Sequence, residues 1–79
     1  MNPLLEDAVS FLQAGKKFTG IHPEKIGEAN REVEFFFTDQ TSDVRQYECD
    51  HQTFMGWWKH TCVYLRHVAD AFEAANPNT

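Results

Sequence analysis

The chain has few of the residues that brace small proteins or mark their surroundings. Its 79 residues include only two cysteines, Cys49 and Cys62, so at most one disulfide could form. No apolar run approaches the roughly 18 residues that a membrane span needs. No N-terminal apolar stretch with a basic flank indicates export. These absences predict a cytoplasmic protein with reduced thiols and no membrane association.

Basic side chains are also scarce. Seven Lys and Arg stand against twelve Asp and Glu, which gives a formal net charge of −5. Proteins that bind the phosphate backbone of nucleic acids need clustered Lys and Arg, and here only Lys16 and Lys17 are adjacent. We therefore expect no direct binding of nucleic acid. An acidic surface keeps a protein soluble, and it also fits a basic surface on another protein.

Motifs of known catalytic chemistry are absent from the sequence. It contains no glycine-rich phosphate loop, no GxSxG elbow, no HExxH and no CxxC. Cys49 and His51 have the residue types of a nucleophile and its base, but residues two apart on a strand seldom touch each other. We therefore predict that the protein is not an enzyme, with no catalytic residues and no cofactor.

The spacing of histidines and cysteines does not predict a metal site either. His60 and His67 would stand roughly 10 Å apart along a helix, whereas two zinc ligands on one helix need a spacing of three or four residues. Cys62 would lie roughly 18 Å along that helix from Asp50. This distance counts against a disulfide with Cys49. We predict no metal site and two free cysteines in the core.

The C-terminal third carries the strongest pattern in the chain. From Asp50 to about Ala75, apolar residues fall in one arc when each residue is advanced by roughly 100°. The arc comprises Phe54, Trp57, Trp58, Cys62, Leu65, Val68, Ala69 and Phe72. Asp50 can cap the start and Asn76-Pro77 can stop the end. We expect one uninterrupted helix of roughly 37 Å, longer than the roughly 30 Å diameter of so small a domain.

A first helix is predicted from Pro3 to about Ala14. Asn2 can cap it, and proline fits the first helical position without loss of a hydrogen bond. Its apolar stripe comprises Leu4, Leu5, Ala8, Val9, Phe11 and Leu12. The segment that follows is ambiguous: a short strand near residues 17–22, a helical turn over residues 22–25 and a loop all fit residues 18–30.

A β-hairpin is predicted in the middle of the chain. Arg31 to Thr38 combines β-prone residues with near alternation, and Val33, Phe35 and Phe37 would face the core. Phe36 would then be left exposed on the other face, with Glu34 and Thr38. A polar turn over residues 39–43 leads into a second strand, Val44 to Cys49, with Tyr47 and Cys49 directed inward.

These elements predict an α+β fold in a single domain of residues 1–79. The order is helix, β-hairpin and long helix, with a third short strand near residues 17–22 as an addition. Because a two-stranded hairpin is unstable alone in water, both helices should pack on one face of the antiparallel sheet.

The function predicted from these observations is binding to another protein. The absence of catalytic motifs, the net charge and the spare length of the long helix favour a regulator or inhibitor that binds a basic surface. Small acidic proteins of phages and other mobile elements act in this way, so such a source is one expectation.

Several residues are candidates for partner contact because the predicted fold leaves them on the surface. They are Phe36, His60, Val63, Tyr64 and His67. A homodimer that forms through Phe36 or the long helix is one form of this prediction. The alternative function is a small-molecule or metal-binding module on the face around His60, Tyr64 and His67.

Overall fold

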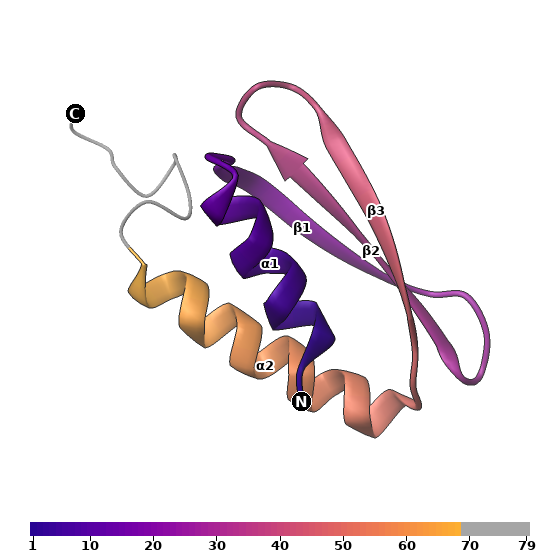
Figure 1. Cartoon of the computed structure of the whole chain (residues 1–79). Helices are drawn as coiled ribbons and strands as arrows, with labels where there is room; N and C mark the ends of the chain where they lie inside the picture. Colours follow the sequence, from indigo (N-terminus) through magenta and orange to yellow (C-terminus); the bar gives the residue numbers. More distant parts are fainter. Residues whose placement is uncertain (69–79) are drawn as a thin grey trace.

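The computed structural model describes residues 1–68, which form two helices and three strands (Figure 1). The elements are α1 (Pro3–Gln13), β1 (Phe18–Lys25), β2 (Asn30–Phe37), β3 (Ser42–Glu48) and α2 (His51–His67). The strands form one antiparallel sheet in the order β1-β2-β3. Both helices lie on the same side of this sheet (Figure 1). The predicted α+β fold is confirmed, including its third strand.

The first strand resolves the segment that the sequence left ambiguous. β1 extends through Pro23 to Lys25, so the alternative of a helical turn over residues 22–25 is wrong. Proline is tolerated there because β1 is an edge strand, where one N–H can be missing from the ladder. A bulge at Thr19 places one extra residue on β1. Phe18 and Ile21 therefore both face the core although they are three positions apart.

The core lies between the sheet and the helices. Its buried residues are Leu4, Ala8, Phe18, Val33, Phe35, Phe37, Tyr47, Phe54 and Leu65. The alternation predicted for β2 is confirmed, since Val33, Phe35 and Phe37 all point toward the helices. The ring of Phe11 on α1 packs 5.0 Å from the rings of both Phe35 and Phe37, measured between centroids. An aromatic cluster therefore holds α1 on the sheet.

Helix α2 is shorter than the apolar pattern predicts. It runs unbroken through Gly56 but ends at His67, and Val68 is extended with φ −101° and ψ 114°. The prediction of a continuous helix to Ala75 is therefore wrong, and Ala69 and Phe72 lie outside the described residues. Leu12, in the last turn of α1, lies near Val68, and the two residues line one hollow.

The buried side of α2 also differs in one residue from the predicted arc. Thr61 is fully buried, and its hydroxyl donates to the Trp57 carbonyl oxygen at 2.8 Å. Phe54 and Leu65 are buried with it, whereas Trp57 and Trp58 are half-buried at the margins. A hydroxyl that bonds to its own helix can enter a core, which is why the apolar pattern alone missed Thr61.

Two residues with polar groups lie in the interior: Tyr47, as predicted, and Arg31, which was not predicted to be there. Arg31 is only 3% exposed, and its Nη1 donates to the carbonyl oxygens of Gly27 and Asn30 at 3.0 and 2.9 Å. Tyr47 donates from its hydroxyl to Asp7 Oδ2 at 2.6 Å, which ties β3 to α1. Both groups are buried at low cost because each has hydrogen-bond partners.

Candidate functional site

The face of the sheet turned away from the helices is open to solvent. The strand register places eleven residues on it, which we call the acidic sheet face: Gly20, His22, Glu24, Asn30, Glu32, Glu34, Phe36, Ser42, Val44, Gln46 and Glu48. Four of these are glutamates and none is Lys or Arg. The three cations of the strands, Lys25, Arg31 and Arg45, belong to the other face in the same register. The alternation therefore places the glutamates of the sheet on one face and its Lys and Arg on the other, where Asp43 pairs with Arg45.

Two of the glutamates repel each other directly. Glu24 on β1 is the cross-strand partner of Glu32 on β2, and like charges placed opposite each other destabilise a sheet. Gln46 Nε2 donates to Glu32 Oε1 at 3.2 Å, which is a neutral contact and leaves both charges uncompensated. In residues 1–68, no ion pair joins a cation to any glutamate of this face.

Apolar groups lie among the glutamates of the acidic sheet face. Phe36 is half-buried, and its ring meets the His22 ring edge-on with centroids 5.2 Å apart. This contact explains why Phe36 is less exposed than the sequence predicts. Val44, the cross-strand partner of Glu34, is 42% exposed. The face thus combines negative charge with a small apolar centre.

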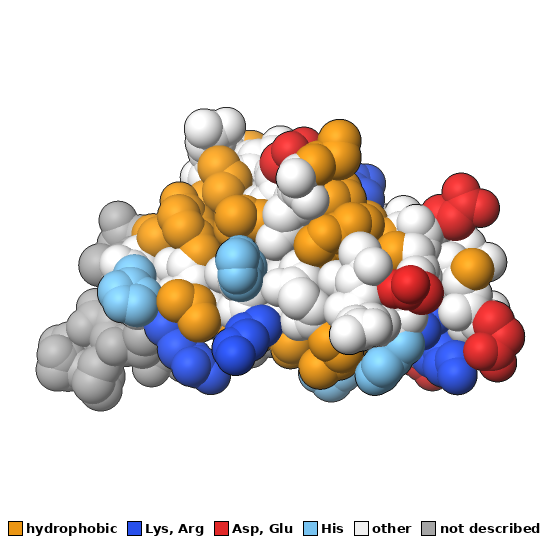
Figure 2. Space-filling view, turned by 90° about the horizontal axis from the view of Figure 1, so that it is seen from below, with side chains coloured by type: hydrophobic (Ala, Val, Ile, Leu, Met, Phe, Trp, Pro, Cys, Tyr) orange, Lys and Arg blue, Asp and Glu red, His pale blue; other side chains and the backbone are white. Residues whose placement is uncertain are grey.

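The outer face of α2 has the opposite charge. We define it by residues three and four apart that point away from the core: Gln52, Gly56, Lys59, His60, Val63, Arg66 and His67. α2 contains no acidic residue between His51 and His67. Figure 2, seen from the side of α2, shows hydrophobic side chains interspersed with Lys, Arg and His, while most carboxylates lie toward the end with the β1–β2 loop.

Large apolar side chains are exposed along α2. Met55, Val63 and Tyr64 are 45%, 44% and 38% exposed. A hollow of about 500 Å³ runs along the helix beside Met55, Val63 and the half-buried Trp58, with Lys59 and Arg66 on its walls. A second hollow of about 440 Å³ lies on the other side of Gly56, next to His60.

The structure brings together four of the five predicted contact residues. His60, Val63, Tyr64 and His67 all lie on the exposed part of α2, and His67 Nδ1 is 2.8 Å from the Val63 carbonyl oxygen. Phe36 lies apart from them on the acidic sheet face, beyond the core. The five predicted contact residues therefore lie on two separate surfaces of the molecule.

The glutamates of the acidic sheet face were not predicted to form one surface. Glu32 and Glu34 alternate with the core residues of β2, which is the signal that places them outward. Glu24 and Glu48 could not be added from the sequence, because the residues opposite them depend on the register of β1 and β3.

The two cysteines are free and half-buried, not fully buried as predicted. Burial raises the pKa of both the Cys49 and the Cys62 thiol, so neither group is activated as a thiolate at neutral pH. Over residues 1–68, no three His, Cys, Asp or Glu side chains are placed to hold a metal ion together.

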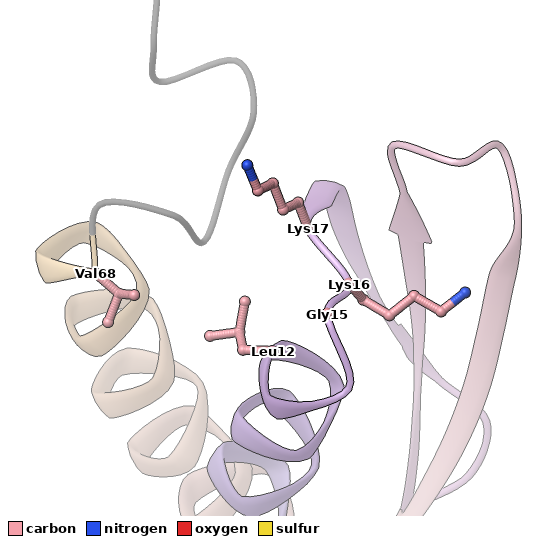
Figure 3. Close-up of a pocket in the computed structure, with 5 residues that line it drawn as sticks. All are labelled: Leu12, Gly15, Lys16, Lys17 and Val68. Carbon is pink, nitrogen blue, oxygen red and sulfur yellow. The ribbon is translucent and has the colours of Figure 1, made fainter.

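A further hollow, of about 340 Å³, lies between the C-terminal ends of the two helices. Figure 3 shows Leu12 and Val68 facing each other from α1 and α2, with Lys17 near the opening and Lys16 directed toward the sheet. Lys16 Nζ is bound to Asp39 Oδ2 at 2.8 Å in the β2–β3 turn. Among the described residues, Leu12 and Val68 give this hollow an aliphatic lining, and Lys16 is paired with Asp39.

Comparisons with protein-family models, with curated proteins and with solved structures give no match to this chain. Within the described part of the chain, no helix has the length and apolar character needed to cross a membrane.

Proposed function

We propose that this protein acts without catalysis, as a regulator or inhibitor that binds a basic surface of another protein through its acidic sheet face. The observation that carries the proposal is the separation of charge on the sheet. Four glutamates and no Lys or Arg lie on the open face, and Glu24 and Glu32 are direct cross-strand partners.

The uncompensated glutamates favour a cationic partner on energetic grounds. Repulsion between Glu24 and Glu32 is present in the free protein. A Lys or Arg from a partner would relieve that repulsion and add attraction, whereas an acidic partner would increase it. Charge complementarity of this kind raises the association rate and excludes wrong partners.

The apolar groups of the acidic sheet face offer a partner apolar surface that can be buried in the interface. Phe36 and Val44 lie between glutamates, so an aliphatic or aromatic side chain of the partner can be buried there beside the charged contacts. Interfaces typically combine an apolar centre with a polar rim. The extra length predicted for the C-terminal helix does not support partner binding, because α2 ends at His67.

Affinity capture tests the proposal. The protein is used as bait in a lysate of the cells that encode it, next to a bait with Glu32→Lys and Glu34→Lys. A matched control carries Glu6→Lys and Glu28→Lys, which changes the net charge equally on exposed sites of α1 and the β1–β2 loop. We expect the unchanged and control baits to retain a basic protein that the sheet variant loses, and high salt to release it.

Two results would contradict the proposal. One is capture that is equal for all three baits, because binding would then be independent of the acidic sheet face. The other is that none of the baits retains any basic protein. Circular dichroism of each bait shows that the folds are the same.

A further inference from the structure

From the complementary charge of the two surfaces, we infer that the outer face of α2 is a docking site for a second copy of this chain, which binds it with its acidic sheet face. Each copy would present α2 to one neighbour and its sheet to another. Such a head-to-tail contact is heterologous, so assembly continues beyond the dimer unless the rotation between copies closes a ring.

Within residues 1–68, the positive charge on the outer face of α2 has no ion-pair partner. Neither Lys59 nor Arg66 forms an ion pair or a side-chain hydrogen bond with another residue of the described chain. Val63 lies between them on the same face and is 44% exposed. This surface suits an occupant that carries carboxylates around a small apolar centre.

Gly56 is an independent sign of a docking surface. A glycine inside a helix lowers its stability relative to alanine. A Cβ at Gly56 would meet no atom within 4 Å, so the packing of this chain does not require a glycine there. Glycine lets another backbone or side chain approach the helix closely, and both hollows of α2 are lined by this residue.

Charge selects the head-to-tail arrangement over the two symmetric ones. A dimer through α2 alone would bring Lys59 and Arg66 of both copies together, and a dimer through the sheets would oppose four glutamates with four more. Both arrangements place like charges at the contact, which disfavours association. Only α2 against the sheet pairs opposite charges.

The two surfaces also match in length. The 17 residues of α2 span about 25 Å, and the 8 residues of β1 or β2 span about 26 Å. A contact between one helix and one three-stranded sheet is small beside the roughly 1,600 Å² of a standard interface. The association is therefore expected to be weak, reversible and dependent on protein concentration.

This inference rests on the proposed function in one respect, because it uses the same acidic sheet face. A second copy bound there would compete with the basic partner. Self-association would thus hold the protein inactive at high concentration and release it on dilution.

Sedimentation velocity over a wide concentration range tests the inference. We expect the average mass to rise past the dimer at low salt and to return to the monomer at high salt. Lys59→Glu with Arg66→Glu, and separately Glu32→Lys with Glu34→Lys, should each weaken association at least about tenfold. An equimolar mixture of the two variants should associate again, because the changed α2 faces the changed sheet with restored opposite signs.

The remaining outcomes overturn the inference. They are a monomer at all concentrations, a dimer that persists in only one variant, and a mixture that stays monomeric although both variants fold. If charge reversal unfolds the sheet, Glu32→Gln with Glu34→Gln replaces it and should still weaken association. The α2 variant separates the two proposals, since it should lose self-association while it still captures a basic protein.

Discussion

Single polar side chains tie separate elements of this protein together. Tyr47 on β3 reaches Asp7 on α1, and Lys16 after α1 reaches Asp39 and Thr41 in the β2–β3 turn. Each contact spans more than twenty residues of sequence. Such contacts stabilise a small core by fixing how its elements meet, and their strength can be measured one at a time.

Replacement of Tyr47 by Phe removes the hydrogen bond to Asp7 and leaves the ring in the core. We expect the free energy of unfolding in urea to fall by about 1 kcal/mol, because burial of the ring is kept and one hydrogen bond is lost. Tyr64→Phe is the matched control, since this exposed hydroxyl has no partner among residues 1–68, and it should change stability by less than about 0.5 kcal/mol. Equal effects of the two changes would refute the role of the Asp7 contact.

The Asp39 carboxyl should titrate well below its usual range. Its hydrogen bonds lower the pKa from 3.8 to about 2. The bond with Lys16 has the largest effect, and the bonds with Thr41 have the next largest. Because the pKa is depressed in the folded state, the contact stabilises the protein above pH 3.8, and this contribution is lost as the pH falls through about 2. Carbon-detected NMR titration measures the midpoint.

Lys16→Met should move that Asp39 midpoint upward toward 3.8. Lys25→Met is the control, because Lys25 lies at the far end of β1 beside Glu28 and should leave the titration of Asp39 unchanged. A midpoint that stays near 2 in Lys16→Met would show that the ammonium group is not the cause.

At the scale of elements, replacement by alanine should have opposite effects on stability at Gly56 and at Gly15. Gly56 lies inside α2 with open space where a Cβ would be, so Gly56→Ala should stabilise the protein by about 1 kcal/mol. Gly15 ends α1 with φ +89°, a left-handed conformation that alanine adopts only with strain, so Gly15→Ala should destabilise it. Thermal unfolding of both variants measures the difference in sign.

The elements also show where sequence patterns stop being informative. The alternation of β2 and the caps at Asn2 and Asp50 predicted their elements correctly, because these signals act within a few residues. The end of α2 was mispredicted, since the apolar arc continues in the sequence beyond His67. A helix forms in water mainly where a packing surface supports it, and the extent of that surface cannot be read from the apolar arc alone.

At the scale of the whole molecule, the negative net charge is the sum of an acidic and a basic surface. A formal charge of −5 describes an acidic protein, yet α2 contains Lys59, Arg66 and three histidines and no Asp or Glu. The strands divide in the same way, with glutamates outward and Lys or Arg toward the helices. The two proposals depend on this division, because each surface attracts a partner of the other sign.

The sequence by itself determined the fold class, the core face of β2 and the starts of both helices. These features follow from local periodicity and capping, which need no knowledge of distant residues. Only the tertiary structure decided that Phe36 and Val63 belong to different surfaces, that Glu24 lies opposite Glu32 and that α2 ends at His67. The physical reason is that strand register and the extent of a shared core arise from contacts between segments far apart in the chain.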